Sequence, residues 1–239
     1  MNLKNQHVVV IGGASGIGYE IAKAARAEGA SATIGGRNRV ALDHALGTLG
    51  KGVVGETIDV TQPDTVNAFF AKLNKVDHIA ITAAHLEGGG ALSQMAESDL
   101  RLQVDVRLMG AIHVIRAAAS KLSSLSSVTL TSGLAVSKPL PNEALGAAAA
   151  AALECLARTL AVEMAPVRFN VVAPGMCDTG FLHRFLGAQG DAIISHVASS
   201  LPVKRIGTPE EVAQAYLFLM KMGYITGETL HIDGGNRLI

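Results

Sequence analysis

Glycines at positions 12, 16 and 18 stand between an apolar run and a helical pattern in the segment VVVIGGASGIGYEIA, residues 8–22. Glycine allows a tight turn and the close approach of a bulky anion to the backbone, and the free N–H groups at a helix start attract negative charge. The spacing therefore predicts a cradle for the pyrophosphate of a dinucleotide, although an ordinary strand-to-helix turn can have the same sequence. The candidate cradle residues are Gly12, Ala14, Ser15, Gly16, Ile17 and Gly18.

The elements that must position this turn can be read from the hydrophobic pattern. Runs rich in valine and isoleucine alternate with amphipathic segments, at 7–12, 31–35, 52–58, 76–82, 127–132, 167–173 and 228–232. Such alternation is typical of a parallel sheet covered by helices on both faces. We therefore expect a single α/β domain over 1–239, with a Rossmann-type, doubly wound sheet of about seven strands in three αβα layers. Ligands of such sheets bind beyond the carboxyl ends of the strands.

Several further motifs follow the glycine turn: IDVT at 58–61, APGMCDT at 173–179 and YITGETLHIDGG at 224–235. Together with the Gly-x-x-x-Gly-x-Gly spacing of the turn, they resemble the short-chain dehydrogenase/reductase family, and the resemblance covers the whole chain. It implies an oxidoreductase with a nicotinamide cofactor. The positions that it implies for cofactor binding are Asp59 and Val60 at the adenine, Ala83 beneath the adenosine ribose, and Pro174, Gly175 and Thr179 at the nicotinamide end.

The second strand run ends in IGGRN (34–38), which bears on the choice of cofactor. Family members that prefer NAD carry an acid at the position of Gly36, where it accepts a hydrogen bond from the ribose hydroxyl. Here Arg37 follows instead, and a guanidinium pairs with a 2′-phosphate. With Asn38 beside it, this segment favours NADP(H) over NAD(H); the alternative is that Arg37 is a solvated loop residue.

Most of the family's catalytic residues are replaced in this chain. Members that reduce carbonyls use a Tyr as proton donor, a Lys that lowers its pKa from ~10, a Ser that orients the substrate oxygen and an Asn that anchors a water relay. Segment 153–175 resembles the family without a gap, and counting back from it puts the Tyr position on Gly146 and the Lys position on Ala150. The segment DVRLMG (105–110) places Arg107 at the Asn position.

The remaining polar candidates leave alternatives open. Ser132 matches the family serine, unless it is only a turn residue that satisfies the backbone. Arg107 cannot release a proton at a useful pH, so it would bind an anion or stabilise an oxyanion, or else pair with a carboxylate or backbone carbonyls in the space of the missing Lys. His85, Glu87 and Lys138 are candidate proton donors, or solvated loop residues.

Two functional hypotheses follow. The first is an atypical NADP-dependent oxidoreductase that acts on a small carbonyl or alcohol. The second is a catalytically silent NADP-binding protein that serves as a sensor, partner subunit or scaffold. The helix with the alanine run 147–152 makes a subunit contact in the family, which implies a homodimer or homotetramer.

Composition restricts the other partners. Lys plus Arg and Asp plus Glu number 20 each and no basic run occurs, so neither a nucleic acid nor an anionic membrane is expected to bind. No uninterrupted apolar run approaches the ~20 residues of a membrane helix, and we expect a cytoplasmic location. Cys155 and Cys177 match no metal or redox spacing, so no metal site is expected.

Overall fold

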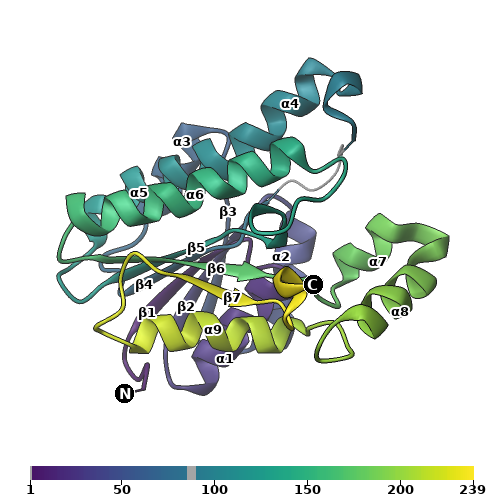
Figure 1. Cartoon of the computed structure of the whole chain (residues 1–239). Coiled ribbons are helices and arrows are strands. Elements are labelled where there is room, and N and C mark those ends of the chain that lie inside the picture. The colour runs from purple at the N-terminus through teal and green to yellow at the C-terminus, as the bar shows by residue number, and fades with distance from the viewer. Residues whose placement is uncertain (1, 85–89) are drawn as a thin grey trace.

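The predicted parallel sheet is present. The computed structural model describes residues 2–84 and 90–239, and its seven-stranded parallel sheet has the order β3-β2-β1-β4-β5-β6-β7 (Figure 1). Each strand overlaps the apolar run that predicted it. The strands are β1 (His7–Ile11), β2 (Ser31–Gly36), β3 (Val53–Thr57), β4 (His78–Ile81), β5 (Ser127–Thr131), β6 (Arg168–Pro174) and β7 (Thr229–Ile232).

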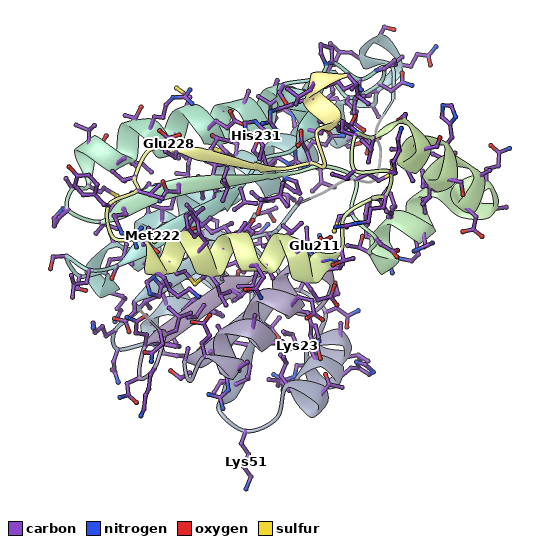
Figure 2. The ribbon with its side chains drawn as sticks, turned by 60° about the horizontal axis from the view of Figure 1, so that its bottom comes forward. Lys23, Lys51, Glu211, Met222, Glu228 and His231 are labelled. Carbon is purple, nitrogen blue, oxygen red and sulfur yellow. The ribbon has the colours of Figure 1, made fainter. Side chains whose placement is uncertain are left out.

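Helices cover both faces of the sheet, which confirms the three-layer αβα arrangement. One layer contains α1, α2 and α9 and the other contains α3, α5 and α6, each with its own hydrophobic cluster. Figure 2 looks onto the first layer and shows α9 running between Glu211 and Met222, alongside α1. The helices are α1 (Gly16–Ala27), α2 (Arg39–Leu49), α3 (Pro63–Ala71), α4 (Glu97–Val104), α5 (Gly110–Ala118), α6 (Ala144–Glu163), α7 (Gly180–Leu186), α8 (Gly190–Ser200) and α9 (Pro209–Lys221).

The continuous apolar run of β1 follows from its central place in the sheet. Val8 and Val10 belong to the cluster under α1 and α9, whereas Val9 and Ile11 belong to the cluster on the other face. Successive side chains of a strand point to opposite faces, so a strand that is covered on both sides needs apolar residues at every position.

The sheet has its switch point beside β1. This strand pairs with β2 on one side and with β4 on the other, so the chain builds outward in opposite directions from it. The connections that leave the carboxyl ends of β1 and β4 therefore diverge to opposite faces, and the space between them opens as a crevice. The glycine turn follows β1 directly and borders this crevice.

Apolar residues recur at three- and four-residue steps from Leu100 to Leu122, which predicts one long helix over 97–121. This helix is present but not regular. α4 and α5 are joined without a break by a π-helical segment, Asp105–Met109, and a 3₁₀ turn over Ala119–Lys121 ends the path. Arg107 lies inside the π-helical segment. Such segments are rare and occur often at functional sites, because the wider turn changes the direction of the side chains on it.

The alanine-rich helix α6 bears on the expectation about apolar runs. It is 20 residues long, and by length and composition it is apolar enough to cross a membrane, but Glu154 and Arg158 interrupt its apolar run, so no uninterrupted run of that length occurs in it. Ala149, Ala150, Leu153 and Ala157 are buried, and α6 contacts β5 and β6. The helix therefore covers the sheet as part of the outer layer.

Candidate functional site

A cleft of about 1050 Å³ opens at the carboxyl ends of the strands, and residues of α7 and α8 form part of its lining. Figure 1 shows where these two helices lie relative to the sheet. The described residues with predicted roles all line the cleft: Gly12, Ala14, Ser15, Gly16, Ile17, Gly18, Arg37, Asn38, Asp59, Val60, Ala83, Arg107, Ser132, Lys138, Pro174, Gly175 and Thr179. His85 and Glu87 lie outside the described residues. The fold thus brings the cofactor candidates and the catalytic candidates into one cleft, while their ligands stay a prediction.

Close packing dictates the glycine turn. Gly12 has φ +92, and a Cβ on it would lie 2.6 Å from Thr82 Oγ1. A Cβ on Gly18 would collide with the Gly12 carbonyl oxygen. These two glycines let α1 start directly against the ends of β1 and β4, so the backbone at the start of α1 borders the cleft. A helix N-terminus that borders a cleft suits a pyrophosphate, since its free N–H groups attract an anion.

The nicotinamide end of the cleft reaches back to the same turn. Thr179 caps the start of α7, where its Oγ1 accepts from the backbone N–H of Leu182 at 3.1 Å. Its Cγ2 would lie 3.6 Å from a Cβ on Gly16. The segment after β6 therefore lies beside the glycine turn, and its contact with the nicotinamide stays a prediction.

The adenosine end combines fixed and exposed groups. Asp59 Oδ1 accepts from the backbone N–H and the hydroxyl of Thr61, at 3.0 and 2.8 Å, which holds that loop in shape. Asn38 Oδ1 caps α2 by accepting from the Ala41 N–H. Arg37 is exposed on the rim of the cleft. A Cβ on Gly36 would make only ordinary contacts of 3.6 Å and more, so packing does not exclude an acid there.

A carboxylate that the sequence analysis missed lies at the vacant Tyr position. A Cβ on Gly146 would lie 2.9 Å from Glu143 Oε2 and 3.8 Å from Gln103 Oε1. Glu143 lines the cleft and is the N-cap residue of α6. The available signal was a carboxylate three residues before the emptied position, at a helix start.

Arg107 contacts the same corner. Its Nη1 donates to the Gly146 carbonyl oxygen at 3.1 Å. Burial lowers the pKa of the Arg107 guanidinium and the Glu143 charge raises it in part, but arginine stays protonated at any useful pH. Of the two interpretations of Arg107, the structure shows the contact with a backbone carbonyl. The guanidinium also borders the cleft, so the binding of an anion stays a prediction.

Ser132 has an unexpected partner. It is 4% exposed, and its Oγ donates to Glu154 Oε1 at 2.6 Å. Glu154 lies two helical turns after Gly146 and one after Ala150, so the three share a face of α6. Lys138 Nζ is likewise engaged, because it donates to the backbone oxygen and Oδ1 of Asn236 at 3.3 and 3.0 Å.

The tyrosines of the chain, which are all described, lie outside the cleft lining. Tyr216 is fully buried, its hydroxyl lies 2.5 Å from Thr131 Oγ1, and burial raises its pKa. Tyr19 donates to Thr48 Oγ1, and Tyr224 is fully exposed. No phenol from elsewhere in the described chain therefore replaces the missing one.

Comparison with known proteins gives a consistent result. The family model described as "Enoyl-(Acyl carrier protein) reductase" matches residues 12–237. The "Short-chain dehydrogenase/reductase ucsE" of Acremonium sp is 34% identical over 98% of this chain and 96% of its own. The "Short-chain dehydrogenase/reductase malC" of Malbranchea aurantiaca is 32% identical over 98% of this chain and 95% of its own.

Solved structures agree at the level of the fold. The structure titled "MalC Reductase/Diels-Alderase" from Malbranchea aurantiaca has a TM-score of 0.94 and 30% identity, covering 99% of this chain and 98% of that one. A small-chain dehydrogenase in complex with NADPH has a TM-score of 0.82 and 28% identity, covering 99% of this chain and 100% of that one. The family match over most of the sequence, and these relatives over nearly all of it, identify this chain as a member of the short-chain dehydrogenase/reductase family of NAD(P)-binding oxidoreductases.

Proposed function

We propose that this protein is an NADP(H)-dependent reductase of a small substrate with a carbonyl or carbonyl-like double bond, and that it works without the Tyr-Lys pair. One observation carries the proposal. The Glu143 carboxylate lies where a side chain at Gly146 would begin, in the same cleft as the glycine turn. A carboxyl group is thus present beside the residue position that carries the proton donor in the family.

Bound NADPH supplies a hydride, and the chain has to bind and orient the substrate beside it. Glu143 and Arg107 border the cleft together, so the carboxyl and guanidinium groups can bind and orient polar groups of the substrate. The walls from α7 and α8, which include Phe181, Leu182 and Val197, supply apolar surface that excludes water. Ser132 borders the reacting end.

The second candidate function is a silent NADP-binding protein. It is favoured because polar side chains of the cleft already hydrogen-bond to other protein groups: Ser132 to Glu154 and Lys138 to Asn236. Loss of a positioned general acid costs ~10² to 10⁴ in rate, which would leave ordinary ketone reduction very slow.

A fluorescence titration with NADPH followed by a substrate panel separates these functions. We expect NADPH to bind and at least one member of a panel of ketones, quinones, imines and enones to be reduced. Binding without oxidation by any of them would favour the silent protein. Absence of NADPH binding would contradict both.

Arg37→Ala is expected to weaken NADPH binding by about 10- to 100-fold, because a charge-assisted pair with the 2′-phosphate is lost. NADH binding should change little, since NADH lacks that phosphate. Arg39→Ala is the matched control, because Arg39 is also exposed but pairs with Asp43 at 2.6 Å and is not part of the cleft lining. Dissociation constants from nicotinamide fluorescence decide, and an equal loss for both cofactors would refute the assignment.

A homodimer or homotetramer and a cytoplasmic location complete the proposal. Support for the assembly comes from a groove between α5 and α6 on the outer surface, which is lined mainly by apolar side chains such as Ile112, Leu156 and Leu160.

A further inference from the structure

The hydrogen bond between Ser132 and Glu154 determines whether Ser132 can donate or accept a hydrogen bond in the cleft. Ser132 Oγ has one hydrogen to donate and two lone pairs. An ionised carboxylate only accepts, so the 2.6 Å contact uses the hydroxyl hydrogen and leaves the Ser132 lone pairs as the group's remaining capacity. Ser132 lines the cleft but Glu154 does not, so Glu154 acts through Ser132.

We propose that the cleft binds a protonated imine, in which a C=N⁺–H group takes the place of a ketone C=O, and that Glu154 is the positioning residue that sets this choice. The inference rests on the proposed reductase function and names its substrate class. A ketone oxygen needs a hydrogen-bond donor, whereas an iminium nitrogen offers an N–H to an acceptor. Ser132 in its observed bonding suits the second.

The chemistry of this substrate also matches the vacancies at Gly146 and Ala150. A ketone that receives a hydride becomes an alkoxide and needs a proton from a donor. An iminium carbon that receives a hydride from bound NADPH forms a C–H bond, the C=N π pair moves to nitrogen, and a neutral amine results. Two electrons and one hydrogen are transferred and no proton is required, so neither the phenol nor its lysine is needed.

The charges around the site are compatible with a cation. Glu143 and Arg107 face each other across the corner at Gly146 and offset one another. The Lys138 ammonium is directed to the oxygens of Asn236. The Glu154 carboxylate, behind Ser132, adds a negative charge that a cationic substrate would balance.

Two matched pairs of probes test the inference. Dihydroisoquinoline is a cyclic imine and tetralone a ketone of similar size; tetrahydroisoquinoline and tetralol are the corresponding amine and alcohol. The amine, which is protonated at neutral pH, should bind the protein–NADP⁺ complex at least about tenfold more tightly than the alcohol in calorimetry, because a site with the wrong hydrogen-bond polarity leaves a polar group unpaired. Turnover of the imine should exceed that of the ketone.

The variant Glu154→Gln tests the role of Glu154. An amide can donate to Ser132 Oγ, which frees the hydroxyl hydrogen for a ketone or alcohol. The amine-to-alcohol affinity ratio should fall at least about tenfold, whereas a merely structural role would weaken both ligands together. Glu163→Gln is the control, because Glu163 is exposed at the far end of α6, and it should leave the ratio unchanged.

The outcomes of these experiments separate the imine inference from the proposed function. Equal binding of amine and alcohol, binding of neither, or an unchanged ratio in Glu154→Gln would overturn the inference while NADPH binding still supports the proposed cofactor. If Glu154→Gln does not fold, the wild-type affinity ratio and the imine-to-ketone turnover ratio still decide. Failure of the wild-type protein to bind NADPH would overturn the proposed function itself.

Discussion

Ketone reduction is expected to rise by ~10² to 10⁴ when the replaced positions return to the family residues, in the triple variant Gly146→Tyr, Ala150→Lys, Arg107→Asn. The introduced phenol would supply the proton that the present site does not position for a ketone oxygen. The introduced ammonium would lower the phenol pKa from ~10 towards neutrality. The measurement is kcat/KM for NADPH oxidation with tetralone.

The structure gives a reason to make these changes together. Glu143 Oε2 lies 2.9 Å from the site of a Cβ at Gly146, but a flexible side-chain end can move aside. Ala150 is buried, so a lysine there must extend along the helix. Glu154 lies one turn further on, at the spacing of an i,i+4 ion pair. That pair would draw Glu154 from Ser132 and return the serine hydroxyl to the substrate.

A control carries the same residue types on another face of α6. Ala148→Tyr, Ala152→Lys, Arg107→Asn places them away from the emptied positions, since Ala148 is exposed. We expect no gain in tetralone reduction from this control, and little from Gly146→Tyr alone. If the first triple variant folds, binds NADPH and is no faster than the control, the vacancies do not account for the chemistry of the site.

The second large effect concerns stability. The free energy of unfolding is expected to fall by ~2 kcal/mol between about pH 7 and pH 4.5 through His78 alone. Burial lowers the pKa of His78 from 6.5 to about 4, more than the Asp77 charge raises it. The ring lies at the start of β4, with Nε2 2.8 Å from Gln6 Oε1 and Nδ1 2.8 Å from Ser127 Oγ.

The sign follows from proton binding. Because the folded-state pKa lies below the unfolded one, the unfolded chain binds the proton first as the pH falls below about 6.5. The stability that neutral His78 permits is therefore present above pH 6.5 and is lost progressively towards pH 4. Other groups titrate in this range too, so the comparison with a variant isolates the contribution of His78.

His78→Gln is the informative variant, because an amide can keep both hydrogen bonds without titrating. Urea unfolding at the two pH values should show a drop in the free energy of unfolding that is smaller by ~2 kcal/mol than in the wild-type protein. Equal drops would contradict the prediction. If the variant does not fold, NMR titration of the His78 imidazole in the wild-type protein tests the same prediction. A pKa near 6.5 would refute it.

The sequence and the structure agree most closely on the fold. Val8, Val9, Val10 and Ile11 predicted a strand buried on both faces, and β1 occupies the centre of the sheet. This pattern could be read because burial acts on each residue of a strand separately and repeats along the chain. The replacement of the family Tyr and Lys at Gly146 and Ala150 stays a prediction, since it depends on which residue stands at a counted position.

The irregular features were less accessible. Periodicity predicted one helix over 97–121, and the π-helical segment around Arg107 leaves no trace in the spacing of apolar residues. The alanine run 147–152 predicted helix and close packing, but its composition gave no sign of what would fill the emptied corner.

The sequence by itself determined the doubly wound sheet and the glycine turn, and it predicts that the usual catalytic residues are replaced, because these features depend on local pattern and on residue identity. Tertiary structure alone decided which groups meet in the cleft. Ser132 reaches Glu154 across 22 positions and Lys138 reaches Asn236 across 98. Such contacts depend on how separate elements pack against one sheet, and a hydroxyl changes from donor to acceptor according to the partner that packing gives it.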